Sequence, residues 1–239
     1  MTVIRLWDLP LRLFHWLLVI AIVGAVATIK AGGGWMVWHE RFGLAVLGLL
    51  TFRVLWGFVG SRYARFSTFL PGPRAIASYL RGHWQGIGHN PLGALSVLAL
   101  LGLFGFQAVS GLFATDEIAF NGPLRTLVSS DWSNQLSSWH RRTEWYLYGL
   151  VALHIAAIAW YRLVRKEDLV RPMITGKKHV TPELAAIEKN QGKEDSGKKS
   201  RAVAFVVAVA ITGGVIWAAN GGLIAPPPAP EPPAYDLGW

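Results

Sequence analysis

The chain has 239 residues, of which 52% are apolar and only 15% are charged, whereas an average soluble domain is about 25% charged. This composition excludes an ordinary soluble domain and indicates a membrane protein. The net charge is +9 and there is no cysteine, which excludes disulfides, thiolate-bound metals, iron–sulfur clusters and covalent c-type haem attachment.

Five continuous apolar runs follow one another at about residues 11–29, 38–59, 92–115, 145–163 and 202–219. Each is near the ~20 residues with which a helix crosses a ~30 Å hydrocarbon core. Because the runs do not alternate, they predict membrane-spanning helices and not barrel strands. The first run has no small-residue cleavage site at its end and predicts a retained span. The fourth helix could begin as early as Trp139.

Basic residues concentrate in three segments: the chain start, the loop between the second and third runs, and the segment between the fourth and fifth. Alternating helices place these segments on one side of the membrane. The positive-inside rule then predicts a cytoplasmic amino terminus and a periplasmic carboxyl terminus in a bacterial inner membrane. Topology and anionic membrane lipid account for the positive charge, so nucleic acid is not an expected partner.

The domain organisation follows from these runs. Residues 1–178 are predicted to form a four-helix core, and residues 201–221 an additional transmembrane helix. Between them, residues 179–200 are rich in Lys, Glu and Gly and predict a flexible cytoplasmic linker. Residues 222–239, with the stretch PPPAPEPPAYDLGW, predict an extended polyproline tail on the periplasmic side. A free ending and docking on a partner both remain open for this tail.

Four of the seven histidines lie in or at the ends of the predicted helices: His15, His39, His140 and His154. An ionisable side chain within a span is costly and points to function, although a lone histidine can simply hydrogen-bond a neighbouring helix. His140 and His154 are 14 residues apart, which puts them on one helix face about 21 Å apart along the axis. Matching depths predict two pairs, His15 with His154 on the inner side and His39 with His140 on the outer side. The third run has no histidine and is expected to act as a packing wall.

Two pairs of imidazoles in an apolar bundle are the ligands that two haems need. Bis-imidazole ligation leaves no open iron position, and bundle helices commonly hold such cofactors. Zinc would want four ligands, and a proton relay would need carboxylates at depth, of which we expect none in the helix interiors. The sequence therefore predicts a di-haem four-helix bundle with two b haems, within an all-α integral membrane protein that has one further helix.

Four arginines are candidate partners for the haem propionates, because buried carboxylates need cationic partners. Arg12 and Arg53 would serve the inner haem, and Arg141 and Arg142 the outer one. Snorkelling to lipid phosphate is the alternative, and it is less favoured for Arg53, which lies in an apolar stretch.

Three helix glycines, Gly43, Gly48 and Gly149, would let a flat macrocycle approach the backbone, although glycines also serve helix packing. His89 lies before the third run in the stretch GHNPLG. It could contact a quinone or a propionate, but the favoured interpretation is a helix start in which Asn90 caps and Pro91 is the first helical residue.

These residues resemble one known family. The stretches VIRLWDLPLRLFHWLLV, VWHERFGLAVLGLLTFRVLWGFVGSRYARF and GHNPLG, with the two histidines of the fourth helix, are similar to the bacterial di-haem cytochrome b561 family, which includes the b-type subunits of membrane nickel–iron hydrogenases. The resemblance covers Thr2 to Lys178. It implies a four-helix core, two b haems ligated at the four histidine positions named above, and electron exchange between the quinone pool and a redox partner.

The function predicted is that of an electron-transfer subunit without catalytic residues of its own. Electrons would pass between the quinone pool and a periplasmic partner, such as a c-type cytochrome or a periplasmic oxidoreductase of the hydrogenase kind. The tail beyond residue 222 lies outside the resemblance and leaves that partner open. Two alternatives are a stand-alone quinol or superoxide oxidoreductase and a non-redox membrane scaffold.

Overall fold

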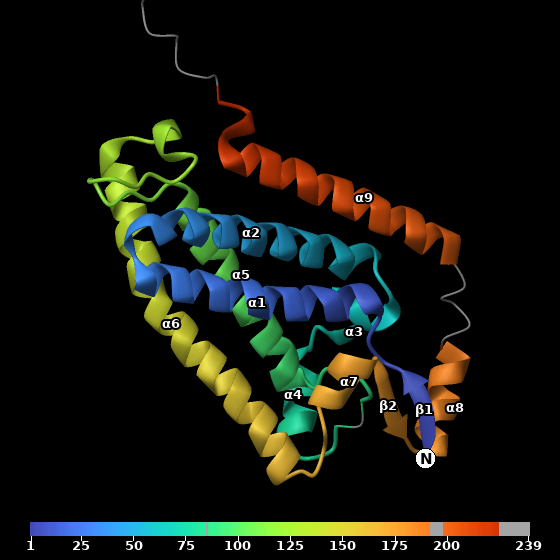
Figure 1. Cartoon of the computed structure of the whole chain (residues 1–239). Coiled ribbons are helices and arrows are strands. Elements are labelled where there is room, and N and C mark those ends of the chain that lie inside the picture. The colour runs from blue at the N-terminus through green and yellow to red at the C-terminus, as the bar shows by residue number, and fades with distance from the viewer. Residues whose placement is uncertain (85, 192–197, 225–239) are drawn as a thin grey trace, which may run out of the picture.

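The computed structural model describes residues 1–84, 86–191 and 198–224 and is mostly helical (Figure 1). Within these ranges, five helices are long and apolar enough to cross a membrane. They are α1 (Leu9–Ala31), α2 (Met36–Val59), α5 (Pro91–Leu112), α6 (Ser130–Leu163) and α9 (Lys198–Trp217). The all-α integral membrane fold predicted from the apolar runs is thereby confirmed.

Two of these helices begin at a residue whose side chain caps the helix. Asp8 accepts a hydrogen bond from the Leu11 amide at 2.8 Å and caps α1. Asn90 accepts one from the Gly93 amide at 2.7 Å and caps α5, with Pro91 at the first helical position. The predicted helix start within GHNPLG is confirmed. Both caps satisfy amide groups that a helix start leaves without an intrahelical partner.

Helix α6 begins nine residues earlier than predicted. Its 34 residues give a length of about 51 Å, well beyond a ~30 Å hydrocarbon core. The sequence missed this extension because polar and charged residues interrupt the apolar run there. The extension is held by hydrogen bonds instead: Ser133 donates to the Phe113 carbonyl at 2.7 Å, and Ser137 accepts from the Thr115 amide at 2.9 Å.

Short elements gather at the end of the bundle where the basic segments meet, which we call the basic end. The loop after α2 holds α3 (Phe66–Phe69) and α4 (Pro73–Leu80), and α6 is followed by α7 (Val170–Thr175). Strand β1 (Thr2–Arg5) pairs antiparallel with β2 (Lys177–Val180), with Thr2 opposite Val180. This small ladder joins the chain start to the segment that follows the fourth span.

The segment predicted as a flexible linker differs from that prediction. Strand β2 runs past the boundary at residue 178, and α8 (Pro182–Gln191) follows it and contacts β1. Thr181 starts α8: its carbonyl accepts from the Ala185 amide at 3.0 Å and its hydroxyl from the Leu184 amide at 3.4 Å. A capping threonine before a proline is a helix-start signal that the compositional argument overlooked. The predicted tail lies almost wholly outside the described residues.

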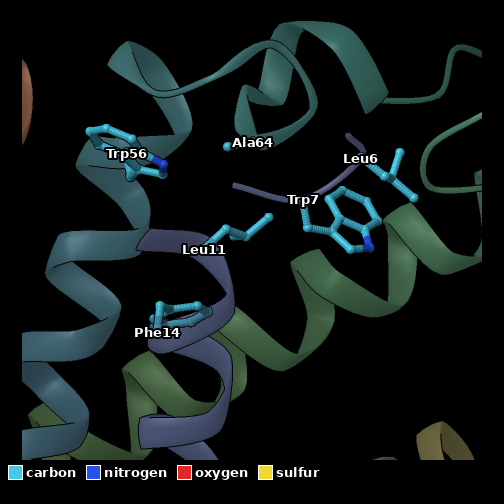
Figure 2. Close-up of a cluster of buried hydrophobic side chains, with 6 residues drawn as sticks. All are labelled: Leu6, Trp7, Leu11, Phe14, Trp56 and Ala64. Carbon is cyan, nitrogen blue, oxygen red and sulfur yellow. The ribbon is translucent and has the colours of Figure 1, made fainter. Parts of the chain in front are cut away.

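Helix α2 is the centre of the packing, because it contacts α1, α5 and α9, and α5 in turn packs against α6 (Figure 1). Helices α1 and α6 do not pack closely along their length, and in the figure α6 diverges from α1 toward the basic end. The apolar core at the basic end consists of Leu6, Trp7, Leu11, Phe14, Trp56 and Ala64 (Figure 2).

Helix α9 occupies the face of α2 that carries Gly48. A Cβ built on Gly48 would lie 2.4 Å from Ile216 Cδ1, so this glycine faces α9 closely. The Phe205 ring of α9 packs edge-on against Phe52 and Trp56, with ring centroids 5.8 Å apart in each case. Gly48 therefore serves helix packing, and the prediction that it makes room for a macrocycle is wrong.

Candidate functional site

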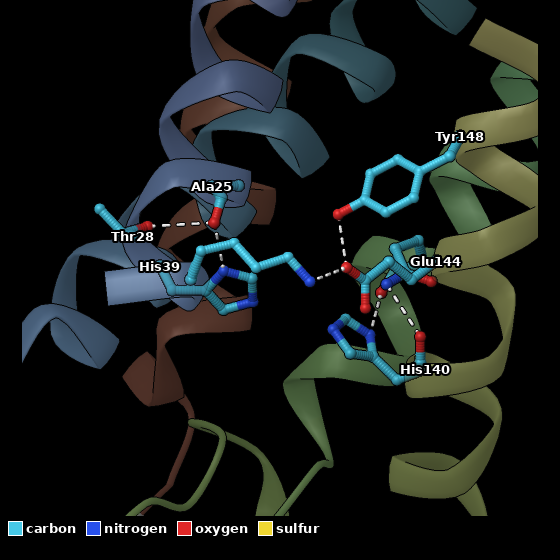
Figure 3. Close-up of polar contacts among 8 residues, drawn as sticks. Ala25, Thr28, His39, His140, Glu144 and Tyr148 are labelled. Atoms are coloured by element: carbon cyan, nitrogen blue, oxygen red, sulfur yellow. Dashed lines mark hydrogen bonds and ion pairs between the residues drawn. The ribbon is translucent and has the colours of Figure 1, made fainter. Parts of the chain in front are cut away.

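His39 and His140 face each other at the end of the bundle opposite the basic end (Figure 3). His39 lies in the first turn of α2 and His140 in α6, and their ring centroids are 6.2 Å apart at an interplanar angle of 87°. Two imidazoles that share one metal at about 2.0 Å from each nitrogen have ring centroids about 6 Å apart. The spacing matches a metal held between the two rings.

The hydrogen bonds of this pair define which ring nitrogen is free. Nδ1 of His39 lies 2.9 Å from the Ala25 carbonyl, and Nδ1 of His140 lies 2.9 Å from the Gln107 carbonyl. Because a carbonyl can only accept, each Nδ1 carries the proton. Nε2 of each ring is then unprotonated and available to a metal, as is usual for histidine ligands held by a backbone carbonyl.

Residues of helix α5 contact His140 and hold it in place. The Gln107 amide donates to the His140 carbonyl at 3.0 Å and accepts from the Thr143 hydroxyl, so one side chain joins the two helices. Ser110 lies 3.2 Å from Nδ1 of the His140 ring. A Cβ on Gly111 would lie 2.9 Å from Cε1 of His140, so the imidazole rests directly on glycine. Helix α5 has no histidine of its own, but it orients His140 in addition to packing against α2 and α6.

The second pair, His15 and His154, lies toward the basic end on α1 and α6. Both side chains are partly buried, and the charges that they would carry interact. Nδ1 of His15 is buried and has no hydrogen-bond partner within residues 1–84, 86–191 and 198–224. Because α6 is one unbroken helix from Ser130 to Leu163, His140 and His154 lie on one face of it, as the sequence spacing predicts.

The ligands of the two pairs favour a haem iron over zinc. A Cβ on Gly43 of α2 or Gly149 of α6 would meet nothing within 4 Å, as is also true of Gly102 and Gly105 of α5, so this space is not particular to the histidine pairs. In the described part of the chain, no three His, Asp or Glu side chains form a group that could hold a metal ion. Paired imidazoles with no further ligand suit a haem iron and do not suit tetrahedral zinc.

The four arginines named as propionate partners fall into two classes. Arg53 is 2% exposed, donates to the Ala64 carbonyl at 3.2 Å and lies 4.9 Å over the Phe66 ring. Arg12 donates to the Ile174 carbonyl and lies against Gly176. Both therefore help to close the basic end.

Arg141 and Arg142 are exposed on α6 next to His140. Arg141 also lines a polar cavity of about 310 Å³ with Thr115, Asp116, Glu117, Asn134 and Ser137. Backbone hydrogen bonds from Phe120, Ile118 and Ala119 lower the pKa of Asp116.

His89 lies at the basic end between two aromatic rings. The ring centroids of Trp7 and Phe69 are 4.7 Å and 4.6 Å from that of His89. Burial, and then the positive charge of Arg53, lowers the pKa of His89 to about 4. The neighbouring Asn90 side chain donates to the Tyr161 hydroxyl at 2.7 Å. The GHNPLG segment thus joins the starts and ends of several helices.

One group of side chains was missed by the sequence argument. Glu144 lies one turn after His140 in α6 and pairs with Lys30 at 2.8 Å, and Tyr148 also donates to it. Glu40 lies next to His39 in α2. Glu40 lies near the start of α2 and Glu144 faces the last turn of α1, so both carboxylates lie near helix ends and do not contradict the expectation that the helix interiors hold none. The spacing of four residues between His140 and Glu144 was the available signal, because such residues share a helix face.

Comparisons with known proteins identify relatives of this chain. The chain is 25% identical over 215 residues to a protein of Azotobacter chroococcum mcd 1, covering 73% of this chain and 88% of that protein. It is 23% identical over 209 residues to a protein of Escherichia coli (strain K12), covering 71% and 88%. The first is named "Probable Ni/Fe-hydrogenase B-type cytochrome subunit" and the second "Probable Ni/Fe-hydrogenase 1 B-type cytochrome subunit". No solved structure shows a significant match.

The family model described as prokaryotic cytochrome b561 matches residues 6–176, which include all four spans that carry or seat the paired histidines. The matched range contains four of the five apolar helices and the facing imidazoles of His39 and His140, which suits a membrane cytochrome. The chain belongs to the prokaryotic cytochrome b561 family, whose members are membrane proteins that carry b-type haem and transfer electrons.

Proposed function

We propose that the chain holds two b haems and passes electrons across the bacterial inner membrane between the quinone pool and a periplasmic redox partner. His39 and His140 would ligate one haem, and His15 and His154 the other. The observation that carries this proposal is the His39–His140 pair, whose rings are 6.2 Å apart with each Nδ1 engaged by a backbone carbonyl. Hydrogen bonds of this kind leave Nε2 free for iron.

The residues of the chain orient and enclose the two haems. Haem iron supplies reversible one-electron chemistry when bound, and two axial imidazoles leave it no open position for oxygen or substrate. Arg141 and Arg142 are placed to meet propionates beside His140. At the basic end, Arg12 donates to the Ile174 carbonyl and Arg53 to the Ala64 carbonyl, and Arg12 also keeps a buried Nε without a partner in the described ranges. This remaining donor favours Arg12 over Arg53 for a propionate contact.

The orientation follows from the distribution of charge. The basic end would face the cytoplasm under the positive-inside rule, with anionic lipid around it, and the His39–His140 pair would lie near the periplasm. The names of the relatives suggest a nickel–iron hydrogenase as the redox partner, with a c-type cytochrome as the other candidate. The Trp7 and Phe69 rings that enclose His89 support a packing role for it more than a quinone contact.

The experiment that tests this proposal is a haem count with redox spectra of the purified full-length protein. We expect two b haems per chain by pyridine haemochrome and a low-spin α-band after dithionite reduction. One haem would exclude one of the proposed pairs, and no haem in a folded protein would favour a membrane scaffold. A quinol should reduce the haems, and turnover with oxygen or superoxide by the isolated chain would favour the stand-alone oxidoreductase instead.

A further inference from the structure

Lys30, Glu144 and Tyr148 form a polar cluster, and Figure 3 shows Glu144 and Tyr148 near the His39–His140 pair. The Glu144 carboxylate accepts from Lys30 Nζ at 2.8 Å and from the Tyr148 hydroxyl. The Lys30 ammonium also lies 5.9 Å from the centre of the Tyr148 ring. Lys30 ends α1, whereas Glu144 and Tyr148 are one turn apart on α6, so the cluster bridges these two helices.

The position of the cluster matters because α1 and α6 lack close packing elsewhere. The two helices carry His15, His140 and His154, and they do not pack closely along their length. The space between them must keep a fixed width if flat cofactors are to bind. An ion pair across their ends is a direct means of fixing that width, since both partners come from rigid helices.

The negative charge of Glu144 lies close to one particular side chain, that of His140. Its side chain is 26% exposed, whereas that of Lys30 is 60% exposed, so water screens the lysine more than the carboxylate. Glu144 lies within electrostatic reach of His140, one helical turn away. Because Glu144 accepts from both Lys30 and Tyr148, its carboxylate is held in place at the end of the bundle that carries the His39–His140 pair.

We propose that Glu144, paired with Lys30 and bonded to Tyr148, is a positioning residue that holds α6 against α1 and places a fixed negative charge beside the haem of His39 and His140. This inference rests on the proposed function. Oxidised haem carries one more positive charge than reduced haem, so a nearby carboxylate stabilises the oxidised form and lowers the midpoint potential. Lys30 acts in the opposite direction and partly offsets that charge.

The test is a redox titration of full-length protein carrying Glu144→Gln or Lys30→Gln. Glutamine in place of Glu144 keeps a hydrogen-bonding amide but loses the charge. We expect Glu144→Gln to raise the midpoint potential of one haem and Lys30→Gln to lower that of the same haem. That haem should be the one that is absent from a His140→Ala variant. A purely structural clamp predicts the same direction for both substitutions, and that result would overturn the charge assignment.

Two further variants keep the inference testable if a single substitution loses the haem. The exchange Lys30→Glu with Glu144→Lys should restore haem binding while leaving the potential above that of the wild type. Failure of the exchange to restore the haem would overturn the positioning role. Glu167→Gln is the matched control, because Glu167 pairs with Lys178 at the same distance of 2.8 Å but at the basic end. It should leave the potential of the His39–His140 haem unchanged.

The haem count separates the two proposals. If wild-type protein binds fewer than two b haems, the proposed function itself is overturned. If it binds two, and neither Glu144→Gln nor Lys30→Gln moves a potential, only the inference about Glu144 is overturned.

Discussion

The two ends of the bundle hold their histidine pairs by different means. At the end with His39 and His140, hydrogen bonds orient the rings, and backbone carbonyls of α1 and α5 accept from each Nδ1. At the basic end, Nδ1 of His15 has no such partner within the described residues, and the surroundings are an apolar cluster closed by short helices and a strand pair. One pair is oriented by direct contacts, whereas the other depends on the closure of its end of the bundle.

The comparison teaches that two histidine pairs proposed for the same role need not be supported by the same kind of contact. Substitutions close to the ring should act strongly and locally at the His39–His140 pair. At the basic end, substitutions should act through the stability of the whole closure, which includes Trp7, Asp8 and Trp56. The expected effects below test this difference between the two ends.

The largest expected effect comes from removing one histidine of each pair. His140→Ala and His154→Ala should each reduce the haem content from two per chain to one, because an iron with one axial imidazole in an apolar site is weakly held. The pyridine haemochrome count measures this, and the remaining α-band should differ between the two variants. His83→Ala is the control and should keep both haems. Loss of both haems from either variant would mean that the two sites are not independent.

Gly111→Ala should weaken the His39–His140 haem without touching a ligand. The added Cβ would lie 2.9 Å from Cε1 of His140, so the ring must shift away from its seat. Overpacking of this kind costs about 1–3 kcal/mol, which corresponds to roughly tenfold or more in haem affinity. Haem titration of the apoprotein measures the change. Gly105→Ala on the same helix, where a Cβ meets nothing within 4 Å, should bind haem as the wild type does.

The basic end should respond to pH through His89. Burial lowers the pKa of His89 to about 4 in the folded protein, against 6.5 for the free side chain. Between these values the unfolded chain binds more protons than the folded one, so stability falls as the pH drops from 6.5 toward 4, by up to about 1 kcal/mol per pH unit. Thermal unfolding in detergent over this range measures the loss, and His89→Phe should reduce the slope. An unchanged slope would place the titrating group elsewhere.

Much of this contrast could not be predicted from the sequence, for physical reasons. The depths of His15, His39, His140 and His154 follow from helix geometry, and the rings of His39 and His140 face each other with centroids 6.2 Å apart. The hydrogen-bond partners of the imidazole rings could not be predicted from the sequence. The Ala25 and Gln107 carbonyls are backbone groups, which any residue at these positions would supply.

Other parts of the structure could not be predicted because no local pattern in the sequence indicates them. The early start of α6 was obscured because a hydropathy average penalises the polar face of a helix that emerges from the membrane. The ion pair between Lys30 and Glu144 joins residues 114 positions apart, and no local pattern indicates such a contact. The position of α9 was equally hidden, since a glycine that faces another helix and one that faces a cofactor look alike in the sequence.

The smallest expected effect tests whether the closure of the basic end acts as a unit. Asp8 caps α1 through the Leu11 amide and accepts from the Trp56 indole at 2.9 Å. Asp8→Ala should therefore cost about 1–2 kcal/mol from the lost cap and the lost hydrogen bond, seen as a lower melting temperature in detergent. Ser129→Ala removes the cap of α6 at the other end, where the bond to the Trp132 amide is 3.4 Å long and exposed, and should cost less. If the closure supports His15, Asp8→Ala should also broaden the spectrum of the His15–His154 haem while leaving the other haem unchanged. Equal broadening of both haems would show that α1 transmits the disturbance along its whole length, and the two ends would then not be separate.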